Sequence, residues 1–185
     1  MWPLASASLS LVNCSLGERA YRFHMYKHIL VPTDGSKVSE DAAGAAIALA
    51  RAVGARITAL HVVAPPAQPQ LECWVHGDPD YGTKLIDALE RRGALYLEAV
   101  REAAMRAGIA CECVIAHGVS PAAQIVREAR LRECDLIMMS SHGPRGAGDF
   151  AGSETLEVVA MGSVPVLAHH ANTEAVEPIR RQQAA

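Results

Sequence analysis

Short apolar runs alternate with longer amphipathic segments along most of this chain. The apolar runs predict β-strands at residues 28–33, 56–64, 110–116, 134–140 and 164–169. The segments between them predict helices at residues 40–53, 84–106, 120–133 and 153–162. Because parallel strands need crossover connections and helices usually supply them, this alternation predicts a doubly wound α/β fold, a parallel sheet with helices on both faces.

Capping residues mark the ends of several predicted helices. Either Ser36 or Ser39 can cap the start of the first helix, and Gly54 is expected to end it. Gly108 closes the second helix, and Pro121 lies in the first turn of the third. The helices are therefore bounded by local signals as well as by periodicity.

Composition suits one domain. The chain has 185 residues, of which 50% are hydrophobic and 20% charged, with a net charge of −3 and a pI near 6.2. Such a balance provides no broad basic surface for nucleic acid, and no run reaches the roughly 18 to 20 apolar residues of a membrane span. We expect a poorly ordered extension at residues 1–24, a domain at 25–170 and a tail at 171–185.

Five cysteines are present, and no two of them form a C-x-x-C pair. Neither a disulfide framework nor a zinc site is indicated, so a cytoplasmic location is expected. Cys111 and Cys113 should share one face of a strand, either as small strand residues or as a redox pair.

Two polar loops leave the carboxyl ends of predicted strands, where doubly wound folds bind their ligands. The first is "PTDGS", residues 32–36, and the second is "SSHGPRGAG", residues 140–148. Backbone N–H groups of a glycine-rich loop, joined to the helix N-terminus near Ser153, suit phosphate groups. A plain turn, with Ser153 only capping the helix, is the structural alternative.

Four motifs in order resemble those of the universal stress protein family: "KHILVPTDGS" (27–36), "LHVV" (60–63), "CDLIMMSSHG" (134–143) followed by "GS" (152–153), and "SVPVLAHH" (163–170). The resemblance covers about Met25 to His170. It implies a five-stranded sheet of order 3-2-1-4-5, a homodimer and, in many members, ATP or AMP bound between the first and fourth strands.

The phosphate loop of nucleotide-binding members follows the pattern G-x2-G-x9-G-[S/T], from which this chain departs twice. Ser140 stands at the first glycine, Gly143 at the second, and Gly152 with Ser153 at the last pair. Only eight residues, 144–151, fill the usual nine, and Gly146 can help the shortened loop readjust.

Matched positions imply the rest of the site. Pro32 and Thr33 border the base, the Val62 backbone reads the adenine edge while its side chain joins the core, and Asp34 either accepts hydrogen bonds from the ribose or holds its turn. His142 has no partner residues for catalysis, so a positional role is favoured. The candidate nucleotide site comprises Pro32, Thr33, Asp34, Val62, Ser140, His142, Gly143, Gly146, Gly152, Ser153 and Glu154.

Three functions compete. The favoured one is a stress-response and regulatory homodimer that binds ATP or AMP, with or without Mg²⁺, and acts through protein partners that the sequence does not identify. The second is a nucleotide-free dimeric interaction module. The third is a slow ATP hydrolase or adenylyl-transfer enzyme, disfavoured because the phosphate loops of ATP pyrophosphatases and P-loop enzymes are missing from the sequence. The last predicted strand has few charged residues, so it is the expected dimer contact.

His169 and His170 are adjacent in that strand. Their side chains should therefore face opposite sides of the sheet, which disfavours a metal site there.

Overall fold

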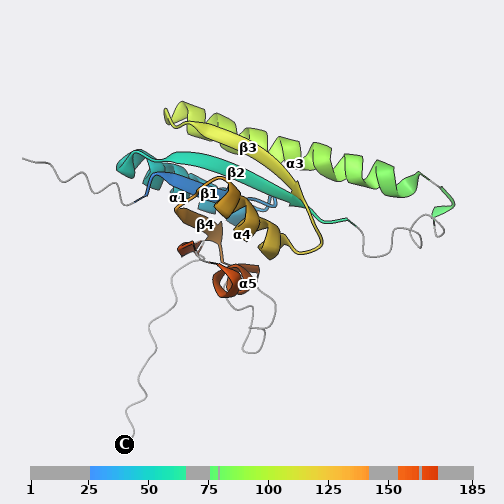
Figure 1. Cartoon of the computed structure of the whole chain (residues 1–185). Coiled ribbons are helices and arrows are strands. Elements are labelled where there is room, and N and C mark those ends of the chain that lie inside the picture. Colours follow the sequence, from blue (N-terminus) through green and yellow to red (C-terminus); the bar gives the residue numbers. More distant parts are fainter. Residues whose placement is uncertain (1–25, 66–75, 79, 142–153, 163, 171–185) are drawn as a thin grey trace, which may run out of the picture.

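A five-stranded parallel sheet of order β3-β2-β1-β4-β5 forms the centre of the structure (Figure 1). The computed structural model describes residues 26–65, 76–78, 80–141, 154–162 and 164–170. The strands are β1 (His28–Pro32), β2 (Arg56–Val63), β3 (Cys111–His117), β4 (Leu136–Ser140) and β5 (Val166–His169), and every neighbouring pair is parallel. The predicted fold class and strand order are confirmed.

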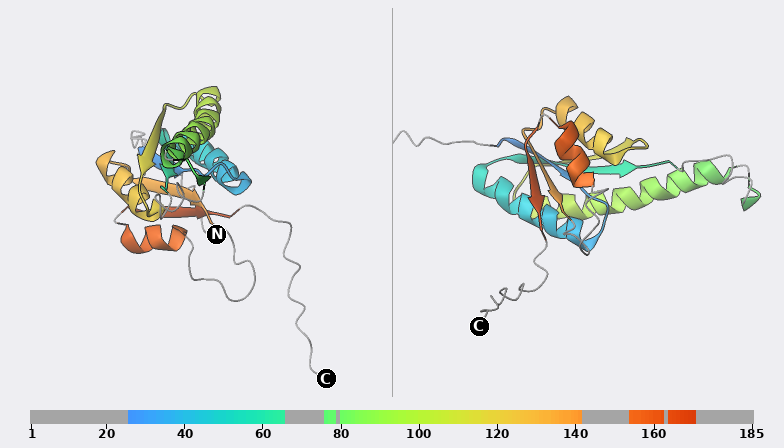
Figure 2. Two further views of the ribbon diagram at one scale, coloured as in Figure 1. Left: turned by 90° about the vertical axis from the view of Figure 1, so that its right-hand side faces the viewer. Right: turned by 90° about the horizontal axis from the view of Figure 1, so that it is seen from below.

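Helices cover both faces of this sheet, as Figures 1 and 2 show. One face carries α1 (Lys37–Val53) and α3 (Tyr81–Arg106), whose buried side chains share a core with Ile29, Val31 and other strand residues. The other face carries α4 (Pro121–Leu131) and α5 (Glu154–Met161), packed over Leu30 and Leu60. Among the described helices, none is both long and apolar enough to span a membrane.

The capping predictions are confirmed for three helices. The side chain of Ser36 accepts a hydrogen bond from the backbone of Ser39 at the start of α1, and Gly54 ends that helix with a φ of 74°, in the left-handed region. Ser120 caps α4, and Pro121 is its first residue. Gly108, just beyond α3, also has a φ of 74°.

Several element boundaries differ from the sequence prediction by a few residues, and two of these differences have a structural reason. Helix α3 begins at Tyr81 rather than Lys84, because the Tyr81 ring stacks on His76 with centroids 3.9 Å apart and Lys84 pairs with Asp78 at 2.6 Å. Strand β5 begins at Val166 because Pro165, just before it, has no N–H group to donate to the ladder. Both corrections reflect contacts or bonding capacity that periodicity does not report.

The thiols in the described part of the chain are protonated at neutral pH. Burial raises the pKa of Cys111 to about 11 and that of Cys134 to about 12, and it also raises the pKa of Cys113. Cys113 donates a weak hydrogen bond to the Leu97 carbonyl at 3.5 Å. Because the thiolate is the reactive form, these environments favour small strand residues over a redox pair for Cys111 and Cys113.

Candidate functional site

The strand order reverses between β1 and β4, the position where doubly wound folds form their ligand crevice. The pairing between these strands joins Ile29 with Leu136 and Leu30 with Ile137. Beyond those pairs, β1 continues beside β2 as far as Pro32, and β4 continues beside β5 as far as Ser140. The carboxyl ends of β1 and β4 therefore lie at the same edge of the sheet without being paired to each other.

The turn after β1 is held in place by Thr33. Its N–H donates to the Leu60 carbonyl at 2.8 Å, which ties the end of β1 to β2. Its hydroxyl lies 3.1 Å from the Ser39 hydroxyl and accepts a hydrogen bond from the Gly35 amide at 3.2 Å. Thr33 is only 6% exposed, so the turn after β1 is fixed by these contacts.

Asp34 holds the same turn from its exposed side. One oxygen, Oδ1, accepts hydrogen bonds from the Ser36 amide at 2.9 Å and the Ser36 hydroxyl at 2.6 Å. Burial by itself would raise the pKa of Asp34, but the hydrogen bonds from Ser36 outweigh it and the pKa lies below its ordinary value. The carboxylate is therefore charged at neutral pH. The sequence left two roles open for Asp34, and the structure shows the one in which it holds the turn.

Gly35 cannot be replaced without displacing a neighbour. Its φ is 75°, and a Cβ added there would lie 2.3 Å from the ring of Tyr96, which comes from α3. The Tyr96 ring also contacts His61 edge-on, with centroids 5.6 Å apart. His61 Nδ1 lies 2.8 Å from the Thr33 carbonyl oxygen. Sequence reasoning missed both rings, although His61 lies within the quoted "LHVV" motif.

The side chain of Val62 lies where the sequence predicts it, and the direction of its backbone groups follows from the strand pairing. Its side chain packs against the core beneath α4. The backbone groups of β2 alternate in direction: the Arg56 amide donates towards β1, to Lys27, and the Ile57 amide donates towards β3, to Ala110. Six residues beyond Arg56, the Val62 backbone groups point to the side of β1, which has already ended.

The β4 side of the crevice is joined to α5 by a residue that the sequence did not single out. The Thr155 hydroxyl donates to the Ser140 carbonyl at 3.1 Å, and Thr155 is buried. The amide of Ser141 donates to the His169 carbonyl of β5 at 2.8 Å. Glu154 is exposed at the first position of α5.

Five predicted site residues lie outside the described residues: His142, Gly143, Gly146, Gly152 and Ser153. Pro32, Thr33, Asp34, Val62, Ser140 and Glu154 are described, and the structure places all but Glu154 at or beside the carboxyl ends of β1, β2 and β4. Within the described part of the chain, no group of three or more His, Cys, Asp or Glu residues is arranged to hold a metal ion.

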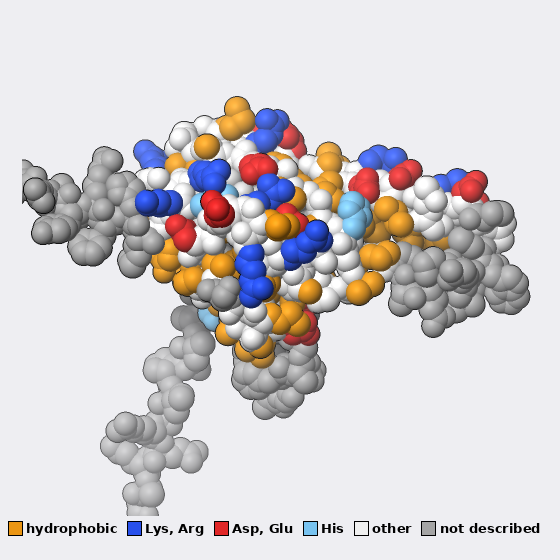
Figure 3. Space-filling model, in the orientation of Figure 1, with side chains coloured by type: hydrophobic (Ala, Val, Ile, Leu, Met, Phe, Trp, Pro, Cys, Tyr) orange, Lys and Arg blue, Asp and Glu red, His pale blue; other side chains and the backbone are white. Residues whose placement is uncertain are grey.

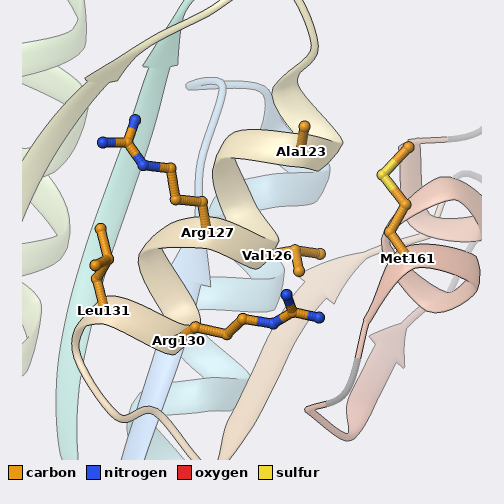
Figure 4. Close-up of a pocket in the computed structure, with 6 residues that line it drawn as sticks. All are labelled: Ala123, Val126, Arg127, Arg130, Leu131 and Met161. Carbon is orange, nitrogen blue, oxygen red and sulfur yellow. The ribbon is translucent and has the colours of Figure 1, made fainter.

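A separate pocket of about 420 Å³ lies along α4 beside the end of α5 (Figure 4). Its lining consists of Ala123, Val126, Arg127, Arg130, Leu131 and Met161. None of these belongs to the candidate nucleotide site, so this pocket is distinct from that site.

Comparison with known proteins gives one consistent result. The model of the universal stress protein family matches residues 25–170. A universal stress protein of Thermus aquaticus is 34% identical over 145 residues, covering 77% of this chain and 98% of that protein. One from Methanocaldococcus jannaschii is 33% identical over 141 residues, covering 76% of this chain and 74% of that protein.

Solved structures share the fold. Universal stress protein UspA from Lactobacillus plantarum superposes with a TM-score of 0.65 at 25% identity, covering 77% of this chain and 97% of that one. An Arabidopsis thaliana family member with AMP bound has a TM-score of 0.57 at 18% identity, covering 80% and 93%. An Archaeoglobus fulgidus member in complex with dAMP has a TM-score of 0.53 at 20% identity, covering 77% and 97%. At these last two identities the likeness concerns the fold alone.

Proposed function

This chain belongs to the universal stress protein family, and on that premise we propose that it binds an adenine nucleotide, ATP or AMP, at the carboxyl ends of β1 and β4. The observation that carries the proposal is the preformed turn after β1, in which Thr33 and Asp34 are fixed by hydrogen bonds beside a reversal of strand order. Family members bound to AMP and dAMP support the choice of ligand.

Each side of the proposed site has a distinct task. Pro32 and Thr33 border the base, and the Val62 backbone faces its hydrogen-bonding edge. Since Oδ1 of Asp34 is engaged in the turn, the other carboxylate oxygen is the one proposed to accept a ribose hydroxyl. These groups recognise the nucleoside rather than the phosphates.

The loop after β4 and the start of α5 form the phosphate side of the proposal. Ser140, His142, Gly143, Gly146, Gly152, Ser153 and Glu154 complete the set. Backbone amides in a glycine-rich loop ahead of a helix attract anions without a lysine or an arginine. Mg²⁺, where it accompanies ATP, would be held mainly by the phosphates.

Mass spectrometry of nucleotide released from protein purified without added ligand tests the proposal directly. Added ATP or AMP should also raise the melting temperature, because a ligand at one hundred times its Kd stabilises the folded state by about 2.7 kcal/mol. The variant Gly152→Val should lose this shift while staying folded. Gly44→Val is the matched control, since a Cβ added at Gly44 meets nothing within 4 Å. A full shift in Gly152→Val contradicts the proposed phosphate loop.

We further propose that the protein holds its nucleotide rather than turning it over. Rapid phosphoryl transfer needs a positioned metal, a cation and a group that orients the nucleophile. Phosphate release in the presence of Mg²⁺ should lie far below the roughly 1 to 100 per second of kinases. Turnover near one per second that disappears in Gly152→Val would instead make the protein an enzyme.

We also propose a homodimer through β5. This strand lies at the edge of the sheet, and exposed apolar side chains lie on it and on the neighbouring α5: Leu156, Val159, Met161 and Leu167. Figure 3 shows hydrophobic side chains gathered around α5. An apolar edge of this kind can pair with a second copy, and the nucleotide-free interaction module would use the same surface.

A further inference from the structure

We propose that His61 is a positioning residue for the nucleotide site: its ring holds the Thr33 carbonyl, and α3 holds the ring. The inference rests on the proposed nucleotide site and adds a residue to it that does not itself touch the ligand. His61 is neither a predicted binding residue nor part of the phosphate loop.

The position of His61 in the sheet explains how its ring reaches the turn. It lies on β2 two residues beyond Ala59 and four beyond Ile57, so its side chain is on the same face of the sheet as theirs, the face that α1 and α3 cover. At this level β1 has ended, and Thr33 has just left the sheet. The side chain of His61 therefore extends over the first residue of the turn.

The contact between His61 and Thr33 is a hydrogen bond in which the imidazole is the donor. Nδ1 of His61 lies 2.8 Å from the carbonyl oxygen of Thr33. Because a carbonyl oxygen only accepts, Nδ1 must carry the hydrogen, which in the neutral ring leaves Nε2 unprotonated. The Thr33 N–H is bonded to the Leu60 carbonyl at 2.8 Å, so β2 binds both backbone groups of Thr33.

Helix α3 keeps the ring in this orientation. A Cβ added at Gly93 would lie 2.3 Å from Cδ2 of His61, so the ring packs directly on the helix backbone where Gly93 leaves room. Tyr96, one turn further along α3, contacts the His61 ring edge-on and also lies against Gly35 in the turn. Helix α3 thus contacts both the His61 ring and the turn after β1.

Two substitutions at His61 distinguish the effect of its hydrogen bond from the effect of its ring packing. His61→Ala removes the donor, whereas in His61→Asn the side-chain amide can place an N–H near the position of Nδ1. In calorimetric titrations with AMP, His61→Ala should bind about threefold to tenfold more weakly, the usual effect of losing one hydrogen bond. His61→Asn should recover most of this loss. A purely structural role would lower the melting temperature without this recovery of affinity.

Two helix glycines provide a matched pair that leaves His61 itself intact. Gly93→Ala should displace the ring and weaken AMP binding, even though alanine favours the helix more than glycine. Gly44→Ala, in α1, adds the same methyl group where nothing lies within 4 Å, and it should leave AMP binding unchanged. Equal affinities in the two variants overturn the proposal.

The wild-type protein provides two further tests. In nitrogen NMR spectra of the neutral ring, His61 should have Nδ1 protonated, and the opposite tautomer overturns the proposal even where a variant fails to fold. If the wild type binds neither AMP nor ATP, the proposed function fails and this inference fails with it. If the wild type binds AMP and His61→Ala binds it equally well, only the positioning role is wrong.

Discussion

At the scale of single residues, the surroundings of His28 shift its pKa. His28, at the start of β1, is buried, and its Nε2 lies 2.8 Å from the Thr58 hydroxyl. Burial lowers the pKa of His28 and the charge of Arg56 lowers it further, against smaller opposing effects that include Asp135. A neutral imidazole is therefore built into the core.

The pH dependence of stability should report this buried imidazole. Because the folded-state pKa lies below the ordinary 6.5, the unfolded chain binds the proton more readily. The contribution is complete above about pH 6.5 and is lost as the pH falls through the folded-state pKa. Urea unfolding should show a free energy that declines below pH 6.5, with His28 contributing at most about 1.4 kcal/mol per pH unit. This part of the slope should be missing in His28→Gln and present in His117→Gln, the exposed-histidine control; identical slopes in both variants contradict the prediction.

Asp34 should lower the stability on acidification in the same sense as His28 but at lower pH, because it is an acid held in its charged form. Its folded-state pKa is below the ordinary 3.8, so its contribution to stability is complete above that value and is lost as the pH falls through the folded-state pKa. Carbon NMR of the Asp34 carboxyl group should show a midpoint below 3.8 in the wild type. Ser36→Ala should move this midpoint upward, since it removes the hydroxyl donor. A midpoint that does not change would show that the Ser36 hydroxyl is not the cause.

At the scale of elements, α1 shows how one residue type can have opposite effects in one helix. Gly44 lies inside the helix, and Gly54 ends it with a φ of 74°. In neither position would an added Cβ meet an atom within 4 Å. Only the backbone conformation therefore distinguishes the two sites.

Alanine substitutions at these two glycines should change stability in opposite directions. Gly44→Ala should stabilise the protein by up to about 1 kcal/mol, because alanine is the better residue in a helix interior. Gly54→Ala should destabilise it by about 1 to 2 kcal/mol, because the left-handed conformation is costly for a residue with a Cβ. Urea unfolding of both variants beside the wild type measures the two changes. Destabilisation by Gly44→Ala would mean that the helix interior is constrained by contacts other than those described.

At the scale of the whole molecule, helices cover the two faces of the sheet, and the β5 edge carries exposed apolar side chains in the part of the chain that the structure describes. Helix pairs cover both faces (Figure 2), whereas β5 ends the sheet on the side of α5. Leu167 on β5 is 37% exposed and Val159 on α5 is 54% exposed. This apolar edge is the surface on which the proposed homodimer depends.

A charged residue at that edge should separate the two copies. Leu167→Lys places a charge in the proposed contact and should convert a dimer into a monomer at micromolar concentration, as measured by sedimentation. Leu95→Lys is the control, since Leu95 is 71% exposed on α3. Circular dichroism must show that both variants stay folded. A wild-type monomer, or a Leu167→Lys variant that remains dimeric, contradicts the proposed interface.

The sequence by itself determined the features that depend on neighbouring residues. Strand and helix alternation follows from hydrophobic periodicity, and caps such as Ser36 and Gly54 act within one turn of the helix that they bound. The polar turn after β1 was also located, because Thr33 and Asp34 follow directly on a buried strand. Family motifs then supplied the strand order, which periodicity alone does not specify.

Only the tertiary structure decided which distant groups support that turn. His61 and Thr33 are 28 residues apart, and Thr155 lies 15 residues beyond Ser140, so each pair meets only through strand register or helix placement. The need for glycine at Gly35 likewise depends on Tyr96, which α3 brings from the far side of a long connection. Hydrophobic patterning specifies which face of an element is buried, but the rotation and position of a helix along the sheet are set by side-chain packing across the whole core.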